Sequence, residues 1–303
     1  MPIATTSSTV PDPYWSRQGT QWEAAPRLDP VRWGDHPGPL GETELVAYER
    51  DGFIVLPSLL SRDEVAEIRR EACALGERLR GGDVDDGLIL EPDGDAVRSV
   101  FAFHRRSQRL AALTRDPRLV DAARQILGGS VRLHQSRINF KPGFVGREFW
   151  WHSDFETWHV EDGMPRMRAL SASVLLSDVS AANGPLLLIP GSHHTYVRTV
   201  GETPPDHFRQ SLRAQTIGVP PPEALQHLVD EAGEVRAATG AAGTVVLFDC
   251  NTMHGSPANI SPLPRDSAFI VYASVDNRLV APFGGRPPRP EFLAHRETEA
   301  LDP

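Results

Sequence analysis

The sequence has few cysteines and no long apolar stretch. Its 303 residues include only two cysteines, Cys73 and Cys250, which are too few for a disulfide framework and are typical of free thiols in a reducing compartment. No apolar run reaches the roughly 20 residues that a membrane-spanning helix needs. The first residues, MPIATTSSTVPDPYW, lack the basic start and apolar core of a signal peptide. We therefore expect a cytoplasmic protein with no membrane partner.

Positive charge is also scarce. The chain has 31 Lys and Arg against 40 Asp and Glu, a net charge of −9, which opposes binding to a phosphate backbone and argues against a nucleic-acid partner. Only 23% of the residues are charged, whereas 27 are proline and 25 glycine. This composition favours many turns over long helices. The 40% hydrophobic content is enough for one sizeable core.

The chain divides into an N-terminal extended arm, residues 1–40, and a single domain, residues 41–303. The arm is rich in Pro, Trp, Arg and Gly and has no hydrophobic period. In the domain, Ser61 and Glu64 form a capping box that predicts a helix from 62 to about 80, and Asp116, Pro117 and Gly128 bracket another helix. Further helices are expected near 42–50 and 221–231, a strand at 53–56, and a solvent-exposed loop at 83–95.

After Gly129 the hydrophobic pattern alternates. Residues 131–141 form one expected strand, on which every second side chain from Val131 to Lys141 lies on a common face; the end of that face is polar, as in a pocket wall. Further strands are expected near 148–153, 170–177, 185–190, 244–250 and 268–275. The short strands and early helices predict a mainly β protein: a double-stranded β-helix barrel of the jelly-roll or cupin type with flanking α-helices.

Three residues are candidate metal ligands. His152 and Asp154 are two residues apart, a spacing that would place both on the same face of a strand, and His254 ends a second apolar strand about 100 residues later. Two histidines and one carboxylate form the facial triad of iron(II) oxygenases, which leaves coordination positions open. The same residues could also bind zinc or be ordinary polar residues of a β protein.

Arg265 and Ser256 favour the iron oxygenase. Arg265 lies 11 residues after His254, at the start of the expected strand 268–275, where its guanidinium could pair with the distal carboxylate of 2-oxoglutarate. Ser256 adds a hydroxyl donor two residues after the histidine. We therefore expect iron(II) as the metal, with 2-oxoglutarate and O2 as cosubstrates.

Several segments resemble a known family. Asn183-Gly184-Pro185-Leu186 and Ile189-Pro190-Gly191-Ser192-His193 are similar to the turn-and-strand signature of the phytanoyl-CoA dioxygenase superfamily. Closer similarity is to the ectoine hydroxylases within it. This resemblance runs from about Trp33 to Ala294 and is carried by FWWHSDFETWHVEDGMP at 149–165, HQSRIN at 134–139, DCNTMHGS at 249–256 and PRPEFLA at 288–294.

The resemblance implies an iron(II)- and 2-oxoglutarate-dependent hydroxylation of ectoine to 5-hydroxyectoine. Succinate and CO2 would be released, the product would serve as a compatible solute under osmotic stress, and the enzyme would be a homodimer. It implies two sets of site residues besides the metal ligands. Asn139, Lys141 and Trp151 would lie near 2-oxoglutarate together with Arg265 and Ser256, and Gln135, Thr157, Trp158 and Arg289 would contact ectoine.

Two other functions fit much of the same pattern. A hydroxylase of another small zwitterion, such as proline, would keep every metal and cosubstrate residue. A cupin-like barrel could hold a metal without turnover. A halogenase on this scaffold would need a small residue in place of Asp154, so the carboxylate argues against it.

Overall fold

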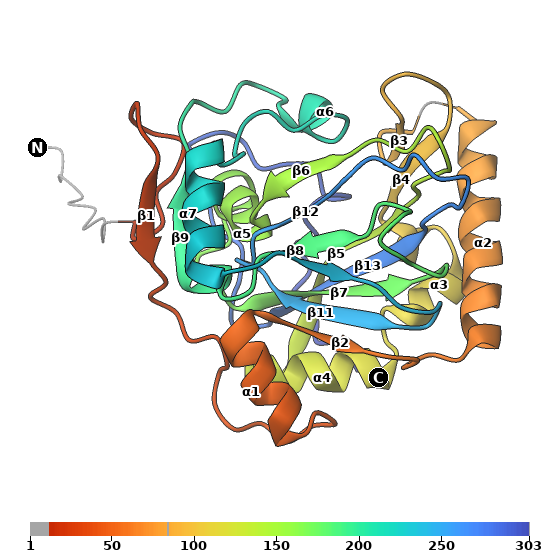
Figure 1. The fold of residues 1–303 in the computed structure, drawn as a ribbon, viewed down its shortest axis with the longest axis horizontal. Coiled ribbons are helices and arrows are strands. Elements are labelled where there is room, and N and C mark those ends of the chain that lie inside the picture. The colour runs from red at the N-terminus through yellow and green to blue at the C-terminus, as the bar shows by residue number, and fades with distance from the viewer. Residues whose placement is uncertain (1–11, 84, 303) are drawn as a thin grey trace, which may run out of the picture.

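The computed structural model describes residues 12–83 and 85–302, and within them two antiparallel sheets face each other. In Figure 1 the smaller sheet lies above the larger one. The seven-stranded sheet has the order β2 (Phe53–Leu56), β11 (Val245–Asp249), β7 (Ala169–Leu175), β13 (Ser267–Ser274), β5 (Val131–Asn139), β4 (Val97–Phe101), β3 (Leu88–Leu90). The four-stranded sheet has the order β10 (Arg236–Ala238), β8 (Leu186–Leu188), β12 (His254–Ser256), β6 (Phe149–His152).

Helices from the first half of the chain cover the outer face of the larger sheet (Figure 1). Their caps follow the sequence: Ser61 and Glu64 form the expected capping box of α2, and Asp116 and Gly128 bound α4. None of the helices in the described residues is long and apolar enough to cross a membrane. The α-helices of six or more residues in the described part of the chain are α1 (Glu42–Asp51), α2 (Arg62–Arg80), α3 (Gln108–Leu113), α4 (Pro117–Leu127) and, beside β9 (Thr195–Arg198), α7 (Pro222–Ala232).

The hydrophobic core has separate parts on the two faces of the larger sheet. The main cluster lies between this sheet and the helices and includes Leu75, Ile126 and Ile270. A smaller cluster lies between the two sheets and includes Leu188 and Phe248. The space between the sheets is therefore only partly filled by apolar side chains, and the remainder is available for a site.

Strand β5 does not keep one side chain face along its length. Tyr272 of β13 pairs with Leu133, whereas Val271 pairs with Gln135, so His134 is an extra residue in β5. Such a bulge shifts the alternation by one residue. As a result Leu133 packs in the helix-facing core, while Gln135 lines the cavity between the sheets. The predicted common face from Val131 to Lys141 is therefore wrong for its first half.

The described part of the N-terminal arm is docked on the domain. Strand β1 (Glu23–Pro26) pairs with β9 (Thr195–Arg198), and Tyr14 is buried against Phe155 and Tyr196. The Arg17 side chain is only 2% exposed. Residues 1–11 lie outside the described part of the chain.

The acidic segment 83–95 is not entirely a solvent loop. Leu88–Leu90 forms β3, which pairs with β4 at the edge of the larger sheet, and Asp85 forms an ion pair with Arg106. The prediction was wrong here because three apolar residues inside an acidic stretch give too short a pattern to indicate a strand. Residue 84 is outside the described residues.

Candidate metal centre and active-site cavity

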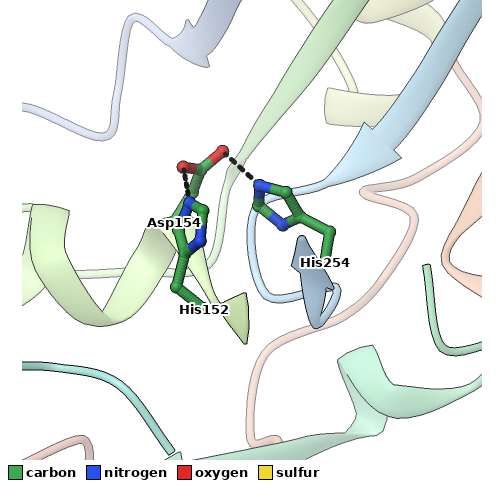
Figure 2. Close-up of side chains that lie close together, drawn as sticks. All are labelled: His152, Asp154 and His254. Carbon is green, nitrogen blue, oxygen red and sulfur yellow. Dashed lines mark ion pairs between the residues drawn. The ribbon is translucent and has the colours of Figure 1, made fainter. Parts of the chain in front are cut away.

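The three candidate ligands lie together where β6 and β12 pair (Figure 2). His254, the first residue of β12, is opposite His152, the last residue of β6. Asp154 begins the helix α5 (Asp154–Thr157). Its Oδ1 lies 3.6 Å from His152 Nε2 and its Oδ2 lies 4.0 Å from His254 Nε2, and all three ligand atoms lie within 4.8 Å of one another. One ion could therefore contact all three.

His152 and Asp154 are brought together by a different geometry from the shared strand face that was predicted. The strand ends at His152, and Asp154 is already helical, so the two residues do not share a strand face. The turn at Ser153 brings the carboxylate back toward the imidazole instead. Ser153 is held by its own hydrogen bond to Asn251 Oδ1, at 2.9 Å.

Backbone carbonyls orient both imidazoles for metal binding. Nδ1 of His152 lies 2.6 Å from the Trp150 carbonyl oxygen, and Nδ1 of His254 lies 2.9 Å from that of Thr252. A carbonyl can only accept, so each ring donates from Nδ1–H and keeps the Nε2 lone pair for a ligand bond. This second hydrogen bond is a common feature of metal-binding histidines.

The protonation states also suit a cation. Burial alone would raise the pKa of Asp154, but the adjacent His254 and Arg137 hold it well below its usual range, and Ser171 Oγ donates to its Oδ2 (3.2 Å). Burial lowers the pKa of His254 to about 4, which keeps that ring neutral. A carboxylate oxygen and two imidazole Nε2 atoms are a donor set that fits iron(II).

A cavity of about 340 Å³ opens beside the ligands, between the two sheets. One wall carries Asn139, Ser256 and Arg265, three of the residues expected near 2-oxoglutarate. Arg265 is buried and donates from Nε to the carbonyl of Gly184 at 3.0 Å. Within the described residues this is the only hydrogen bond of its guanidinium, so both terminal nitrogens remain for a carboxylate.

Lys141 supports this wall from behind. Its Nζ donates to Ser256 Oγ at 2.7 Å and to the Pro257 carbonyl at 2.5 Å. Burial and the neighbouring Arg265 lower the pKa of Lys141 to about 5, and an anionic ligand would raise it again. Gly184 has φ +75°, and a Cβ there would lie 2.8 Å from Lys141 Cδ, so glycine is required at this position.

The opposite end of the cavity carries the residues expected to contact the substrate. Gln135, Thr157, Trp158 and Arg289 all line it. Trp158 begins a π-helical turn, Trp158–Asp162, whose last residue receives two hydrogen bonds from Arg289, at 2.8 and 2.6 Å. The turn therefore positions an aromatic ring and, through Asp162, a guanidinium at the same wall.

Gln135 is held just as firmly. Its Nε2 donates to the Leu293 carbonyl and its Oε1 accepts from Arg137 Nη1, each at 2.6 Å. Because Leu293 is four residues after Arg289, the same contact ties the C-terminal segment to β5.

The structure places two expected residues, Lys141 and Trp151, outside the cavity lining and adds others. Trp151 is absent from the cavity lining and packs with Ile189 and Met253, whereas its neighbours Phe149 and Trp150 line the cavity. Arg137 also lines it; its position on β5 between Gln135 and Asn139 was a signal that we did not use. His207, on a loop distant in sequence, lines the cavity as well.

Comparison with known proteins identifies the family to which this chain belongs. The model of the phytanoyl-CoA dioxygenase (PhyH) family matches residues 48–267. The ectoine dioxygenase of Sphingopyxis alaskensis is 53% identical over 288 residues, which cover 94% of this chain and 93% of that protein. That of Halomonas elongata is 52% identical, covering 91% and 83%, and that of Streptomyces coelicolor is 46% identical, covering 97% and 98%.

The solved structures agree. EctD from S. alaskensis, crystallised with 2-oxoglutarate and 5-hydroxyectoine, superposes with a TM-score of 0.85 and is 49% identical. The match covers 96% of this chain and 96% of that one. The same enzyme with bound Fe gives a TM-score of 0.83 and 47% identity, with 96% of this chain and 97% of that one covered. These similarities confirm the double-stranded β-helix with flanking helices. The chain belongs to the phytanoyl-CoA dioxygenase (PhyH) family and, within it, to the ectoine dioxygenases.

Proposed function

We propose that the cavity between the two sheets is the active site in which this chain hydroxylates ectoine to 5-hydroxyectoine. The chain is an ectoine dioxygenase that uses iron(II), 2-oxoglutarate and O2 and releases succinate and CO2. One observation supports the location above all. The only set of three potential metal ligands found in the described residues opens onto a cavity lined by all four predicted substrate residues and by three of the predicted cosubstrate residues, Asn139, Ser256 and Arg265.

In this proposal His152, Asp154 and His254 hold the metal. Iron(II) supplies, when bound, the redox chemistry that couples decarboxylation of 2-oxoglutarate to hydroxylation of the substrate. The protein keeps the two Nε2 atoms deprotonated through the carbonyl contacts at Nδ1. The buried carboxylate provides the single negative charge of the ligand set.

Arg265 and Ser256 are proposed to bind the cosubstrate, with Lys141 supporting Ser256 from behind the wall. The free terminal nitrogens of Arg265 would form a bidentate pair with its distal carboxylate, and Ser256, already hydrogen-bonded to Lys141 Nζ, would donate its own hydroxyl proton to the same group. Asn139 is held by Ser99 Oγ, 2.9 Å from its Oδ1, so its amide nitrogen is free to donate to a ligand.

Ectoine is a small zwitterion, and the proposed contacts match its two charges. Trp158 offers a π face to the delocalised cation. Arg289 uses Nε and Nη2 on Asp162 and keeps Nη1 for the substrate carboxylate. Gln135 contributes its remaining amide hydrogen and Thr157 a hydroxyl. Each of these side chains has a protein contact before the substrate arrives, including Thr157, whose Oγ1 accepts from Arg17 Nη2 at 3.4 Å, and this reduces the entropy lost on binding.

We further propose that the enzyme serves the synthesis of a compatible solute under osmotic stress and acts as a homodimer in the cytoplasm. The family resemblance supports the role and the dimer. The two free thiols, Cys73 and Cys250, support a reducing compartment.

The test measures succinate release under iron(II) and O2 with ectoine or proline as substrate. Ectoine should stimulate release, with one 5-hydroxyectoine formed per succinate, and proline should not. Asp154→Ala should abolish both products, whereas Asp230→Ala, which removes an exposed carboxylate of α7, should behave as wild type. Stimulation by proline alone would favour the other hydroxylase, and no turnover with either would refute catalysis.

A further inference from the structure

The loop before α6 (Phe208–Ser211) places a histidine in the active-site cavity. His207 lines the cavity together with Trp158, Glu161 and Arg289, although it lies almost 50 residues from the first two and more than 80 from the third. Its side chain belongs to a residue that is only 4% exposed. No motif near His207 in the sequence indicates a role in ligand binding.

Both ring nitrogens of His207 are buried and have no hydrogen-bond partner among the described residues. Buried polar atoms in folded proteins are nearly always paired, and leaving one unpaired costs about 1–3 kcal/mol. An imidazole with two unpaired nitrogens facing a cavity therefore indicates a partner that enters the cavity.

The imidazole of His207 is neutral in this cavity. Burial lowers the pKa of His207. Two neighbouring carboxylates, Glu161 and Glu156, oppose this lowering, whereas Arg17 and Arg289 reinforce it. A neutral imidazole has one donor and one acceptor nitrogen. It can hydrogen-bond to a zwitterion without adding a charge to a wall that already carries a guanidinium.

The position of His207 is set by its neighbour. Phe208 packs with Ile89, Phe101 and Leu293, and its ring lies 6.3 Å from that of Phe292 at an edge-to-face angle. The residue is therefore anchored to the C-terminal segment that also carries Arg289. The His207 carbonyl accepts from the backbone nitrogens of α6 at 3.0 Å, which fixes the backbone on the other side.

We propose that His207 is a further specificity-determining residue, whose imidazole hydrogen-bonds a polar group of the bound ectoine beside Arg289 and Trp158. This inference rests on the proposed function of the cavity. The loop before α6 thus contributes a direct contact to the substrate. No such contact to 2-oxoglutarate is expected, because the residues proposed to bind it line the other end of the cavity.

The test compares His207→Phe, His207→Gln and Arg209→Gln with the wild-type holoenzyme. Phenylalanine keeps the ring and the packing but removes both polar atoms, whereas glutamine keeps one donor and one acceptor. Arg209 is an exposed residue of α6 that pairs with Asp86. Its substitution is the control for a general loosening of the loop. The readouts are the KM for ectoine, the KM for 2-oxoglutarate and the ratio of 5-hydroxyectoine to succinate.

His207→Phe should raise the KM for ectoine about tenfold, the effect of losing about 1.4 kcal/mol of binding. The KM for 2-oxoglutarate should stay unchanged, which also shows that the variant is folded. His207→Gln should recover most of the affinity, and Arg209→Gln should match wild type.

An unchanged ectoine KM in His207→Phe would overturn the inference, and so would an equal loss in His207→Phe and His207→Gln. A tenfold loss in Arg209→Gln would also overturn it, because the effect would then come from the loop. If wild type itself did not turn over ectoine, the proposed function would fail first, so the two failures are distinguishable.

Discussion

Replacing Arg17 by Met should both destabilise the protein and weaken substrate binding. Arg17 donates from Nε and Nη2 to Glu156 at 3.0 and 2.8 Å, and from Nη1 to Glu161 at 2.5 Å and to Thr203 at 2.9 Å. Arg17 and Glu156 are each only 2% exposed. Methionine fills a similar volume and removes the charge, so two carboxylates lose their cation inside the protein.

The magnitude follows from this burial. Removing one partner of a buried ion pair typically costs about 3–5 kcal/mol, because the remaining charge is neither solvated nor paired. We expect the free energy of unfolding at pH 7.5 to fall by about that amount. Arg80→Met, which breaks an exposed pair with Glu77, should change it by less than about 1 kcal/mol.

The pH dependence gives an independent check. Burial would raise the pKa of Glu156, but Arg17 and its hydrogen bonds lower it. In wild type the carboxylate therefore contributes stability above its ordinary pKa, and this contribution is lost as the pH falls through the lowered value. Without Arg17 the hydrogen bonds from Ser16 and Thr199 remain, but the cation that opposes burial is gone. The pKa of Glu156 therefore rises, and protonation relieves the unpaired charge. The difference between wild type and variant should shrink from pH 7.5 to pH 5.

Denaturant unfolding at the two pH values, with the KM for ectoine, tests this reasoning. Glu156 and Glu161 flank Thr157 and Trp158 in the chain, so the KM should rise while that for 2-oxoglutarate does not. Arg17→Met combined with Glu156→Gln should recover part of the stability. A loss below about 1 kcal/mol, or one that does not depend on pH, would refute the reasoning.

Two further outcomes are expected. Asp162→Asn should raise the KM for ectoine about tenfold or more with little change in the KM for 2-oxoglutarate, because Arg289 loses its charged, bidentate partner. An unchanged KM for ectoine would show that Arg289 needs no such anchor. Burial lowers the pKa of His104, His134 and His193 to about 4, so unfolding takes up protons below about pH 6.5. The free energy of unfolding of the metal-free protein should therefore fall steeply from pH 6.5 to 4.5, by up to about 1.4 kcal/mol per pH unit for each histidine. A flat profile in denaturant titrations would contradict this expectation.

The elements that the sequence predicted well are those with a local physical signal. The helix at 62–80 is fixed by Ser61 and Glu64, and the helix at 117–127 by Asp116 and Gly128, because capping groups satisfy backbone atoms within a few residues. The strand at 53–56 was correct to the residue. The strands that were missed, such as β3, β10 and β12, are three residues long and exist because a neighbouring strand pairs with them.

The metal ligands were predictable for a similar reason, although the details were not. His152 and Asp154 are close in the chain, and any turn that follows β6 can bring them together. The position of His254 opposite His152 depends on the register of two strands about 100 residues apart, which no local pattern encodes. His254 was predicted as the end of an apolar strand, but that strand, β11, stops at Asp249, and His254 begins β12 instead.

The substrate end of the cavity shows why periodicity fails where a fold is specialised. Strand alternation predicts one face from Val131 to Lys141, and a single extra residue, His134, sends Leu133 to the helices and Gln135 to the cavity. His134 itself lies against Trp158, with 5.0 Å between ring centroids, and 3.5 Å from Asp162.

The bulge therefore does more than change the side chain pattern. It places a buried imidazole between the aromatic ring and the carboxylate that orients Arg289. Removing the extra residue would restore regular alternation, with Leu133 still toward the helices and Gln135 still toward the cavity, but it would take this imidazole away. The metal end of the cavity depends on the pairing of two strands, whereas the substrate end depends on this irregularity and on ion pairs from Arg17 and Arg289. Substitutions that alter substrate choice should accordingly be found around these ion pairs, and they should cost stability more often than substitutions in the cosubstrate wall.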